Sequence, residues 1–396
     1  MRIHVWVGCT LLMALMACGD RAARAQTASG EREAACKAYQ ELLAMFPEDR
    51  QGYGKDHYRS RVDHQPMTYG LVLSAEAAHL KSAPNDESRR RVRLAARWLL
   101  DNRDLDGDGL PGWGLPQDYV ASDGLKMPPN HPYTVTTAIV LDGLLDALNA
   151  PADWSDAERK EIRSVMVQVV LRWCRHVWSE GYGGGYFWYN PRRDHAFCLN
   201  ASSMFGGAMV RLLKEHGDAM TAEERRLIED RTDQQAKAVV ASVNLWHGMP
   251  YWHYAAQPNK LNFTHPNDLL HHVYTLWGIE LYRDCGGRVP LPWTRAQAVQ
   301  SMERFWHDGQ ICPLPPKTVS ATAKPLRLWD TGTMLAFYAK WGEPRQAQQA
   351  FEFIHEKCGP WPNLRLFPTE KPTDESFYPR HAAHVLFGLA LYCYPQ

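Results

Sequence analysis

Apolar side chains recur three and four residues apart along most of this chain, and polar or aromatic-rich segments separate the periodic runs. One run places Val92, Ala95, Ala96 and Leu99 on one face, with Asn85 in position to cap it. Such spacing is typical of amphipathic α-helices. The pattern predicts helices over residues 31–46, 67–82, 85–102, 133–149, 155–178, 196–216, 221–245, 268–283, 294–307, 328–341, 344–357 and 378–394.

The connections between these helices follow a rhythm. Helices pair across short turns, and most pairs are joined by a long loop rich in Trp, Tyr, His, Arg and Gly. Strand signals are nearly absent, apart from short runs in loops such as 186–189. Six helical hairpins predict an all-α toroid of the (α/α)6 type, with the long aromatic-rich loops at one end. An α-solenoid has the same helix count, but its repeats resemble one another in sequence, and these do not.

The N-terminus carries an export signal. Arg2 precedes an apolar run over residues 5–17, which predicts a signal peptide over residues 1–25 and a single toroid domain over residues 26–396. Two ways of processing the signal remain open. Residues 23–25 fit an A-x-A cleavage site, and Cys18 ends a lipobox-like run, in which it would carry a lipid anchor. We therefore expect export to the bacterial periplasm, or to the outer membrane as a lipoprotein.

Charge and cysteine usage exclude several classes of protein. The formal net charge is zero, which argues against a nucleic-acid partner, since such binders need a marked basic excess. The cysteines after the signal region are scattered, with no C-x-x-C pair, so we predict no zinc site and cannot assign disulfides. We expect a monomer that acts on a polysaccharide or oligosaccharide.

A short acidic loop has half of a calcium-binding pattern. Asp104, Asp106 and Asp108 occupy positions 1, 3 and 5 of a D-x-D-x-D-G run, as the carboxylates of a calcium loop do. The bidentate Glu expected at position 12 is replaced by Leu115, although Asp118 or a backbone carbonyl group could substitute. A structural Ca²⁺ and an acidic turn without an ion both fit this pattern.

Two long loops hold the candidate chemistry. Residues 180–200 contain three consecutive glycines, an aromatic run and a basic pair before Asn200, and residues 249–267 contain an aromatic and histidine cluster. Sugars present apolar C–H faces that stack on flat rings, and Arg forks bind carboxylates. The composition therefore indicates a carbohydrate site. The substrate-binding residues we expect are Tyr189, Trp188, Trp252, Arg192, His271, His272, Arg327, Trp329, Tyr378 and Arg380.

Histidines near two predicted helix starts allow several interpretations. Neighbours on a helix point about 100° apart, so only one of His271 and His272 is expected to face the toroid centre. Asp268 is placed to cap the same helix. His381 and His384 lie three residues apart on one face, where a metal pair, a binding site and a purely structural role all remain open.

With these features, the chain resembles the alginate-lyase-like (α/α) toroid polysaccharide lyases and related toroid glycosidases. The resemblance covers most of the mature chain as architecture, but only short clusters as motif. It implies β-elimination on a uronate-containing polysaccharide, in which Asn200 neutralises the carboxylate and Tyr254 is base and acid. The family's Asn-His doublet is absent, because Ala201 follows Asn200. The implied catalytic residues are Asn200, Tyr254, His253, His195 and Arg193.

The elimination is chemically sensible without a cofactor. Donors on the substrate carboxylate stabilise the enolate that forms when the C5 proton leaves, and nearby cations would lower the pKa of a Tyr base. A glycoside hydrolase on the same fold needs two carboxylic acids roughly 5–10 Å apart, and Glu is scarce in these loops. A C5-epimerase would share the proton abstraction. A non-catalytic glycan-binding protein would use the aromatic residues but would need no cluster of His and Tyr.

Overall fold

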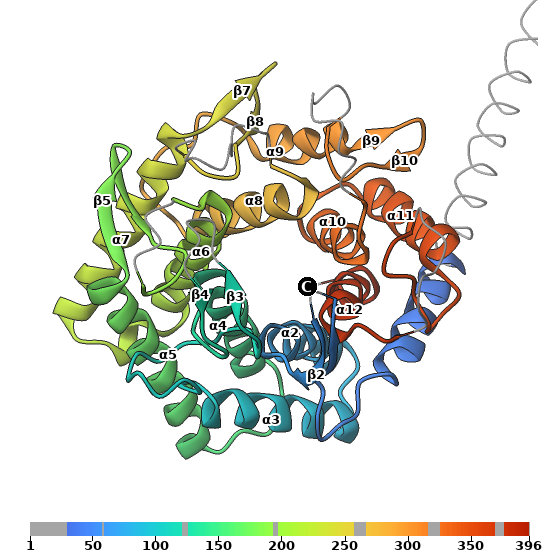
Figure 1. The fold of residues 1–396 in the computed structure, drawn as a ribbon, viewed down its shortest axis with the longest axis horizontal. Coiled ribbons are helices and arrows are strands. Elements are labelled where there is room, and N and C mark those ends of the chain that lie inside the picture. Colours follow the sequence, from blue (N-terminus) through green and yellow to red (C-terminus); the bar gives the residue numbers. More distant parts are fainter. Residues whose placement is uncertain are drawn as a thin grey trace, which may run out of the picture.

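The computed structural model describes residues 30–57, 59–120, 126–192, 197–256, 267–315, 325–368 and 376–395. Within this part of the chain, helices form two concentric rings (Figure 1). The inner ring comprises α2 (Pro66–Ser82), α4 (Thr134–Leu148), α6 (Leu199–His216), α8 (Leu269–Asp284), α10 (Leu328–Trp341) and α12 (Pro379–Cys393). The outer ring comprises the helix over residues 30–43, α3 (Asp86–Asp101), α5 (Asp156–His176), α7 (Ala222–Ala241), α9 (Arg295–Ser301) and α11 (Pro344–Phe353).

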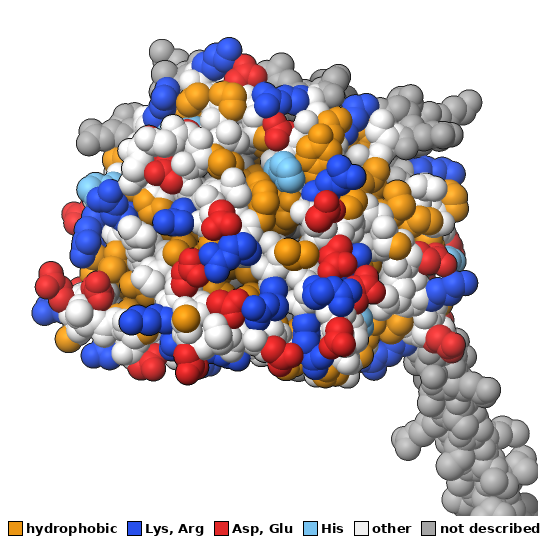
Figure 2. All heavy atoms as spheres, turned by 90° about the horizontal axis from the view of Figure 1, so that it is seen from below, with side chains coloured by type: hydrophobic (Ala, Val, Ile, Leu, Met, Phe, Trp, Pro, Cys, Tyr) orange, Lys and Arg blue, Asp and Glu red, His pale blue; other side chains and the backbone are white. Residues whose placement is uncertain are grey.

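The two rings differ in how their helices are buried. The inner helix α2 is buried on every side from Pro66 to Leu80, as expected of a helix surrounded by protein. The outer helix α3 buries one stripe that includes Val92, Ala95 and Leu99, and it exposes charged residues on the opposite face. Figure 2 shows acidic and basic side chains interspersed over one side of the molecule, without a large patch of either sign. The twelve predicted helices and the (α/α)6 toroid are confirmed.

Glycines bring the inner helices together in pairs. A Cβ atom on Gly143 of α4 would lie 2.5 Å from the carbonyl oxygen of Gly70 on α2, and one on Gly278 of α8 would lie 2.0 Å from that of Ser203 on α6. Real side chains do not come this close to backbone atoms, so any larger residue would force the helices apart. The facing pairs are Gly70 with Gly143, Gly207 with Gly278, and Gly332 with Gly388.

We expect Gly278→Ala to lower the free energy of unfolding by about 3 kcal/mol, because its methyl group collides with backbone rather than with a movable side chain. Gly217→Ala is the matched control. Its Cβ atom would make ordinary contact at 3.5 Å with Leu213, and its φ of −63° suits alanine. Urea unfolding followed by circular dichroism measures both variants. Equal stability of the two would contradict the close packing of α6 and α8.

Within the described residues, five two-stranded antiparallel hairpins occupy connections between the helices. Each follows an outer helix, and three of them turn on a residue pair with positive φ at both positions: Tyr182-Gly183, His247-Gly248 and Asp308-Gly309. Such pairs favour the tight turns that suit twisted strands. The hairpins are β1 (Tyr53–Asp56) with β2 (Arg59–His64), β3 (Tyr119–Val120) with β4 (Lys126–Met127), β5 (Trp178–Gly181) with β6 (Gly184–Phe187), β7 (Asn244–Trp246) with β8 (Met249–Tyr251), and β9 (Trp306–His307) with β10 (Gln310–Ile311).

These hairpins correct two predicted helix ends. The helix expected over residues 221–245 ends at Ala241, and the one expected over 294–307 ends at Ser301, followed by the 3₁₀ turn η2 (Met302–Phe305). Short helical segments also extend other elements, namely η1 (Gly217–Ala219) and the π-helix η3 (Ile354–Cys358). Among the described residues, no helix is both long and apolar enough to cross a bilayer. The predicted signal peptide and Cys18 lie outside those residues.

Candidate active site

The loops that precede the inner helices gather at one end of the ring, and backbone hydrogen bonds connect them in sequence. Each bond runs from the first N–H group of an inner helix to a carbonyl oxygen of the loop that precedes the next inner helix, and so satisfies a donor that the helix leaves unpaired. In α2 and α12 the first residue is proline, which has no N–H group. The bonds are Thr134 to Tyr189 (3.0 Å), Leu199 to Tyr254 (3.3 Å), Leu269 to Pro313 (2.9 Å) and Leu328 to Leu366 (2.9 Å).

A histidine and a carboxylate form one acid–base unit at this end. Asp268 caps α8 by accepting a hydrogen bond from the backbone N–H of His271, and its Oδ1 also lies 2.6 Å from His271 Nδ1. The carboxylate therefore accepts a hydrogen bond from Nδ1–H, and this tautomer leaves Nε2 of His271 as the basic nitrogen. Asp268 is buried, whereas the His271 side chain is 23% exposed. Tyr254 contacts the same imidazole edge to face, with ring centroids 4.8 Å apart.

A second unit lies on α12 and the β1–β2 hairpin. His381 Nε2 lies 2.7 Å from Nδ1 of His57, and the His381 ring stacks on Trp329 of α10 at 4.1 Å. Arg380 binds Asp56 at 2.9 Å and approaches His57 Nδ1 at 3.4 Å. Burial, followed by the nearby Arg380 and Arg327 charges, lowers the pKa of His57 to about 2. Burial and the neighbouring His57 hold the pKa of His381 well below its usual value. Both imidazoles are therefore neutral near pH 7.

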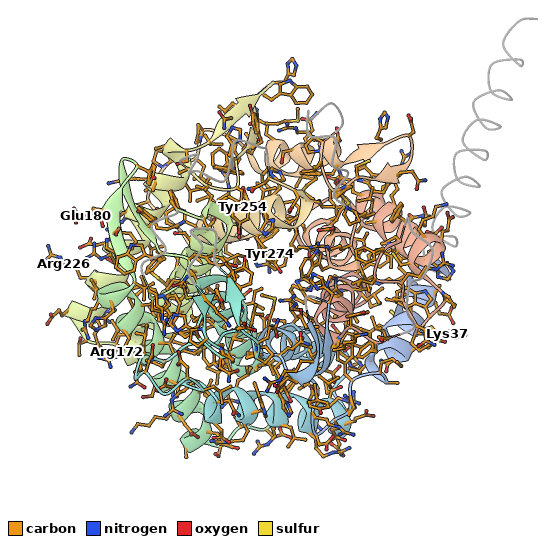
Figure 3. All side chains as sticks on the ribbon, viewed as in Figure 1. Lys37, Arg172, Glu180, Arg226, Tyr254 and Tyr274 are labelled. Atoms are coloured by element: carbon orange, nitrogen blue, oxygen red, sulfur yellow. The ribbon has the colours of Figure 1, made fainter. Side chains whose placement is uncertain are left out.

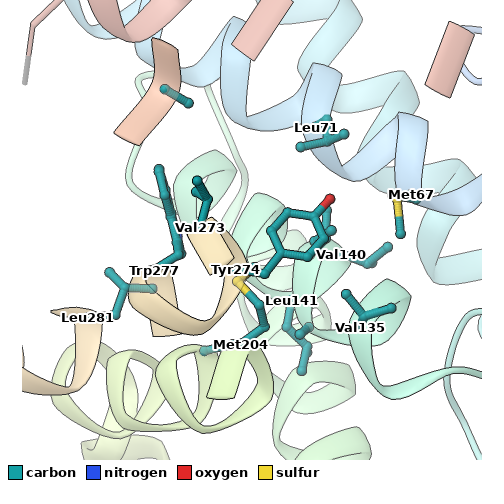
Figure 4. Packing of buried hydrophobic residues seen from close by; sticks show 14 of the residues in the cluster. Met67, Leu71, Val135, Val140, Leu141, Met204, Val273, Tyr274, Trp277 and Leu281 are labelled. Carbon is teal, nitrogen blue, oxygen red and sulfur yellow. The ribbon is translucent and has the colours of Figure 1, made fainter. Parts of the chain in front are cut away.

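The two units lie on inner helices that α10 separates in the ring. His271 and His381 are each the third residue of their helices, and Tyr274 and His384 follow them by one turn. The Tyr274 hydroxyl lies 2.6 Å from His384 Nε2, so α8 and α12 touch across the centre at that level. Figure 3 shows Tyr254 and Tyr274 on the inner side of the ring, and Figure 4 shows Tyr274 among the apolar side chains of the centre. His271 and His381 thus stand about 4.5 Å above this contact.

The Tyr274–His384 contact forms a floor to the site. Below it lies a cavity of about 30 Å³, whose lining includes Trp277 and Phe387. His384 is also held by its Nδ1, which lies 2.7 Å from the carbonyl oxygen of Arg380. Burial lowers the pKa of His384 to about 3 and raises the pKa of the Tyr274 hydroxyl. The floor is therefore neutral, and the titratable groups with exposed surface lie above it.

Several residues predicted for substrate binding lie in the core. Trp252 is fully buried, and its indole N–H donates to the carbonyl oxygen of Val239 at 3.0 Å. His272 is also buried, with Nε2 2.9 Å from Ser301 Oγ, and burial lowers its pKa to about 3. Both side chains point from α8 and its loop toward the outer ring. They pack the inner ring against the outer ring and are not part of the candidate active site.

The catalytic residues implied by the resemblance are only partly brought together. Asn200, in the first turn of α6, is 1% exposed, and its Nδ2 has no hydrogen-bond partner among the described residues. Burial raises the pKa of Tyr254 well above its ordinary value, and the neighbouring Cys198 thiol adds to the shift. A tyrosine base needs the opposite shift. His253 is half-buried beside Tyr251. Arg193 and His195 lie outside the described residues.

The remaining predicted binding residues lie in the loops that precede α6, α10 and α12. Tyr189 is half-buried against Tyr133 with ring centroids 5.3 Å apart, and Trp188 is buried with its indole N–H donating to Ser179 Oγ at 2.6 Å. Arg327 lies over the Trp329 ring at 5.3 Å. Two more residues differ in exposure: Tyr378 is half-buried and Arg192 is exposed.

Sequence reasoning missed three residues of this site. His57 and Asp56 lie in a short polar segment that was expected to be an ordinary loop, and Tyr274 has the helical spacing of a core residue. The dipeptide Asp56-His57 was a weak signal at best. Its role becomes visible only when the β1–β2 hairpin is packed against α12, 324 residues later in the chain.

Comparison with known proteins establishes the fold. No protein-family model matches this chain, and no curated protein sequence matches it. Among solved structures, it is similar to cellobiose 2-epimerase from Spirochaeta thermophila, with a TM-score of 0.61 and 14% identity over 93% of this chain and 98% of that one. It is also similar to a D-mannose isomerase (0.58, 12%, 91% and 96%). A GH76 α-mannanase from Bacteroides thetaiotaomicron is comparable (0.57, 12%, 91% and 95%).

Proposed function

We propose that this chain is a carbohydrate-active enzyme that epimerises or isomerises a reducing sugar by moving a proton at the carbon beside the carbonyl group. One observation carries the proposal: the Asp268–His271 unit on α8 and the His57–His381 unit on α12 both lie one helical turn above the neutral Tyr274–His384 floor. Similar folds in a cellobiose 2-epimerase and a D-mannose isomerase support this reaction class.

The reaction we propose begins at His271. Its Nε2 lone pair takes the proton from C2 of the open-chain sugar, and the electrons of that C–H bond form a C1–C2 double bond while the carbonyl electrons move to O1. Asp268 stabilises the imidazolium that results, as a carboxylate does when it holds the other ring nitrogen. The Arg380 guanidinium beside His57 adds positive charge near the enediolate, where charge develops.

The second histidine unit then completes the transfer. Because both imidazoles are neutral, the donor would be an imidazole N–H: its proton on the opposite face of C2 gives the C2 epimer and leaves an imidazolate beside Arg380, which regains a proton through solvent as the His271 imidazolium releases one. Donation to C1, with a proton moved from O2 to O1, gives the ketose instead. Either product is an isomer of the substrate, so no oxidant, reductant or other cofactor is consumed. Half-buried Tyr189 and Tyr378 would contact the sugar beside this centre.

Elimination on a uronate polymer, predicted from the sequence, is our second proposal. Asn200 favours it, because its buried Nδ2 has no partner among the described residues and could bind a carboxylate. The raised pKa of Tyr254 weighs against it. Hydrolysis is less well supported, since Asp56 is paired with Arg380 and Asp268 with His271, which leaves neither carboxylate poised as a free acid–base pair.

One experiment separates these reactions. The purified protein is incubated in D₂O with glucose, mannose, N-acetylglucosamine, cellobiose and, separately, alginate and glucuronan. We expect a reducing sugar to give an isomer that carries deuterium, detected by proton NMR and mass spectrometry. An unsaturated uronate with ultraviolet absorbance would instead establish elimination. New reducing ends without deuterium would establish hydrolysis. Either of these two results overturns the epimerase or isomerase proposal.

A further inference from the structure

The acidic loop that follows α3 folds as a tight turn around its carboxylates. Gly107 and Gly109 both have positive φ (69° and 80°), which lets the backbone fold back between the aspartates. The Asp108 Oδ1 accepts a hydrogen bond from the Leu110 N–H at 2.8 Å. Oxygen atoms of Asp104 and Asp106 are nevertheless shielded from solvent: Oδ1 of each is buried and has no hydrogen-bond partner among the described residues. Such oxygens are costly unless a cation or donor reaches them.

A histidine from a distant loop joins this cluster. His131, which precedes α4 and is 2% exposed, lies with Nδ1 2.9 Å from Asp106 Oδ2. Ligand atoms of Asp106, Asp108 and His131 all lie within 4.8 Å of one another. The Asp106 side chain is 10% exposed, so its unpartnered Oδ1 points into protein rather than water. A buried carboxylate held on one side and vacant on the other is typical of a metal ligand fixed by an outer donor.

We infer that this loop binds a divalent calcium ion through the carboxylates of Asp106 and Asp108, which cluster with His131, and that His131 orients Asp106 from outside. Carboxylate oxygens at alternate positions along the loop favour calcium, a hard cation, over zinc or copper. The sequence suggested Asp118 as a substitute for the missing position-12 ligand. Asp118 instead pairs with Lys126 at 3.0 Å, so His131 is the residue that the fold brings to the cluster.

A calcium ion here would link the acidic loop to the segment that precedes α4, at the end of the ring that carries the candidate active site. The acidic loop continues to Trp113, whose carbonyl oxygen accepts a hydrogen bond from the Tyr133 N–H at 3.0 Å. The Tyr133 ring in turn contacts Tyr119 and Tyr189 at centroid distances of 5.8 and 5.3 Å. We therefore expect calcium to stabilise the fold by fixing this aromatic wall. The inference does not depend on the proposed reaction.

Thermal unfolding and calorimetry of the full chain test the inference. After treatment with EDTA and removal of the chelator, calcium chloride should raise Tm by about 2–4 °C at saturation. Isothermal titration with calcium chloride should give one ion per chain, with a Kd of about 10⁻⁴–10⁻³ M because the bidentate glutamate is missing. Asp106→Asn should abolish both effects. Asp101→Asn, an exposed carboxylate one turn upstream in α3, should leave them unchanged.

The titration of the wild-type protein decides the question even if Asp106→Asn fails to fold. Absence of calcium binding, or a Tm that calcium does not change, overturns the inference. A calcium response that Asp106→Asn retains would place the ion elsewhere and also overturn it. His131→Gln provides a milder second variant, for which we expect at least tenfold weaker calcium binding, since outer partners of this kind typically contribute 10–100-fold. Stronger stabilisation by zinc chloride than by calcium chloride would show that the metal class is wrong.

Discussion

Replacing His271 by asparagine is expected to lower kcat by about 10³-fold, because the variant loses the basic nitrogen that we propose takes the substrate proton. The fold should survive. Asparagine keeps the backbone N–H that Asp268 caps, and its side-chain N–H₂ can donate to Asp268 as imidazole Nδ1–H does. Steady-state kinetics on the sugar identified by the D₂O screen gives kcat, and the rate of deuterium entry at C2 measures the proton transfer itself.

The matched control for this variant is His307→Asn. His307 is 60% exposed in the β9–β10 hairpin, away from both histidine units, and its loss should leave kcat and deuterium exchange unchanged. Circular dichroism and Tm must be the same for both variants before kinetics are compared. If His271→Asn keeps more than a tenth of the wild-type exchange rate, another group takes the proton, and the assignment of His271 as base is wrong.

Acidification is expected to unfold the protein near pH 5, well above the range in which carboxylates lose their charge. Four buried histidines remain neutral in the folded state: the pKa of His57 is about 2, that of His272 and of His384 about 3, and that of His381 is well below its usual value. Burial is the largest cause in each case. In the unfolded chain each would titrate near 6.5.

The sign of the effect follows from proton binding. Below about pH 6.5 the histidines bind protons in the unfolded state but not in the folded state. The stabilisation that they give is therefore fully present above that pH and is lost as pH falls toward 3. Each histidine contributes up to about 1.4 kcal/mol per pH unit, so the four together contribute up to about 5.5 kcal/mol per pH unit. A folded protein has only about 5–15 kcal/mol in total. A fall of one to two pH units below 6.5 should therefore be enough to unfold the protein.

Far-ultraviolet circular dichroism as a function of pH measures this transition. His272→Gln removes one titrating group while keeping a donor for Ser301 Oγ, and it should reduce the pH dependence of stability by about a quarter of the combined histidine effect. His307→Gln, at an exposed position, should not. Native ellipticity retained at pH 4 in the wild-type protein would mean that the buried histidines accept protons without unfolding.

The helical ring could be predicted from the sequence because its signals are local and repeated. Apolar spacing, the capping boxes at Ser155 and Thr221, and alternating connection lengths each determine structure within a few residues of themselves. The hairpins were missed because their strands are two to six residues long and carry few β-branched residues. Asp308-Gly309 was a recognisable turn signal. The residues before it continued the helical pattern, and the helix was predicted to run to His307, which instead lies in β9.

The site was predicted in part, because chemistry-bearing residue types can be read from sequence but their directions cannot. The neighbours His271 and His272 illustrate this. The His271 side chain is partly exposed, whereas His272 packs against Ser301 in the core. The expectation that only one of them faces the centre fits this arrangement. Trp252 was chosen as an exposed loop residue, yet its indole N–H is satisfied by the backbone of α7. Its burial depends on tertiary packing that no local pattern reports.

The contact between His57 and His381 joins residues 324 positions apart, so it constrains when an active molecule can first exist. A ribosome adding roughly 5–20 residues per second would need roughly 15–60 s to travel from the first histidine to the second. Throughout that interval the β1–β2 hairpin lacks the helix on which it packs, and the ring lacks its last inner member. On the proposed mechanism, a chain truncated before α12 would carry Asp268 and His271 but lack His381, and we expect it to be inactive.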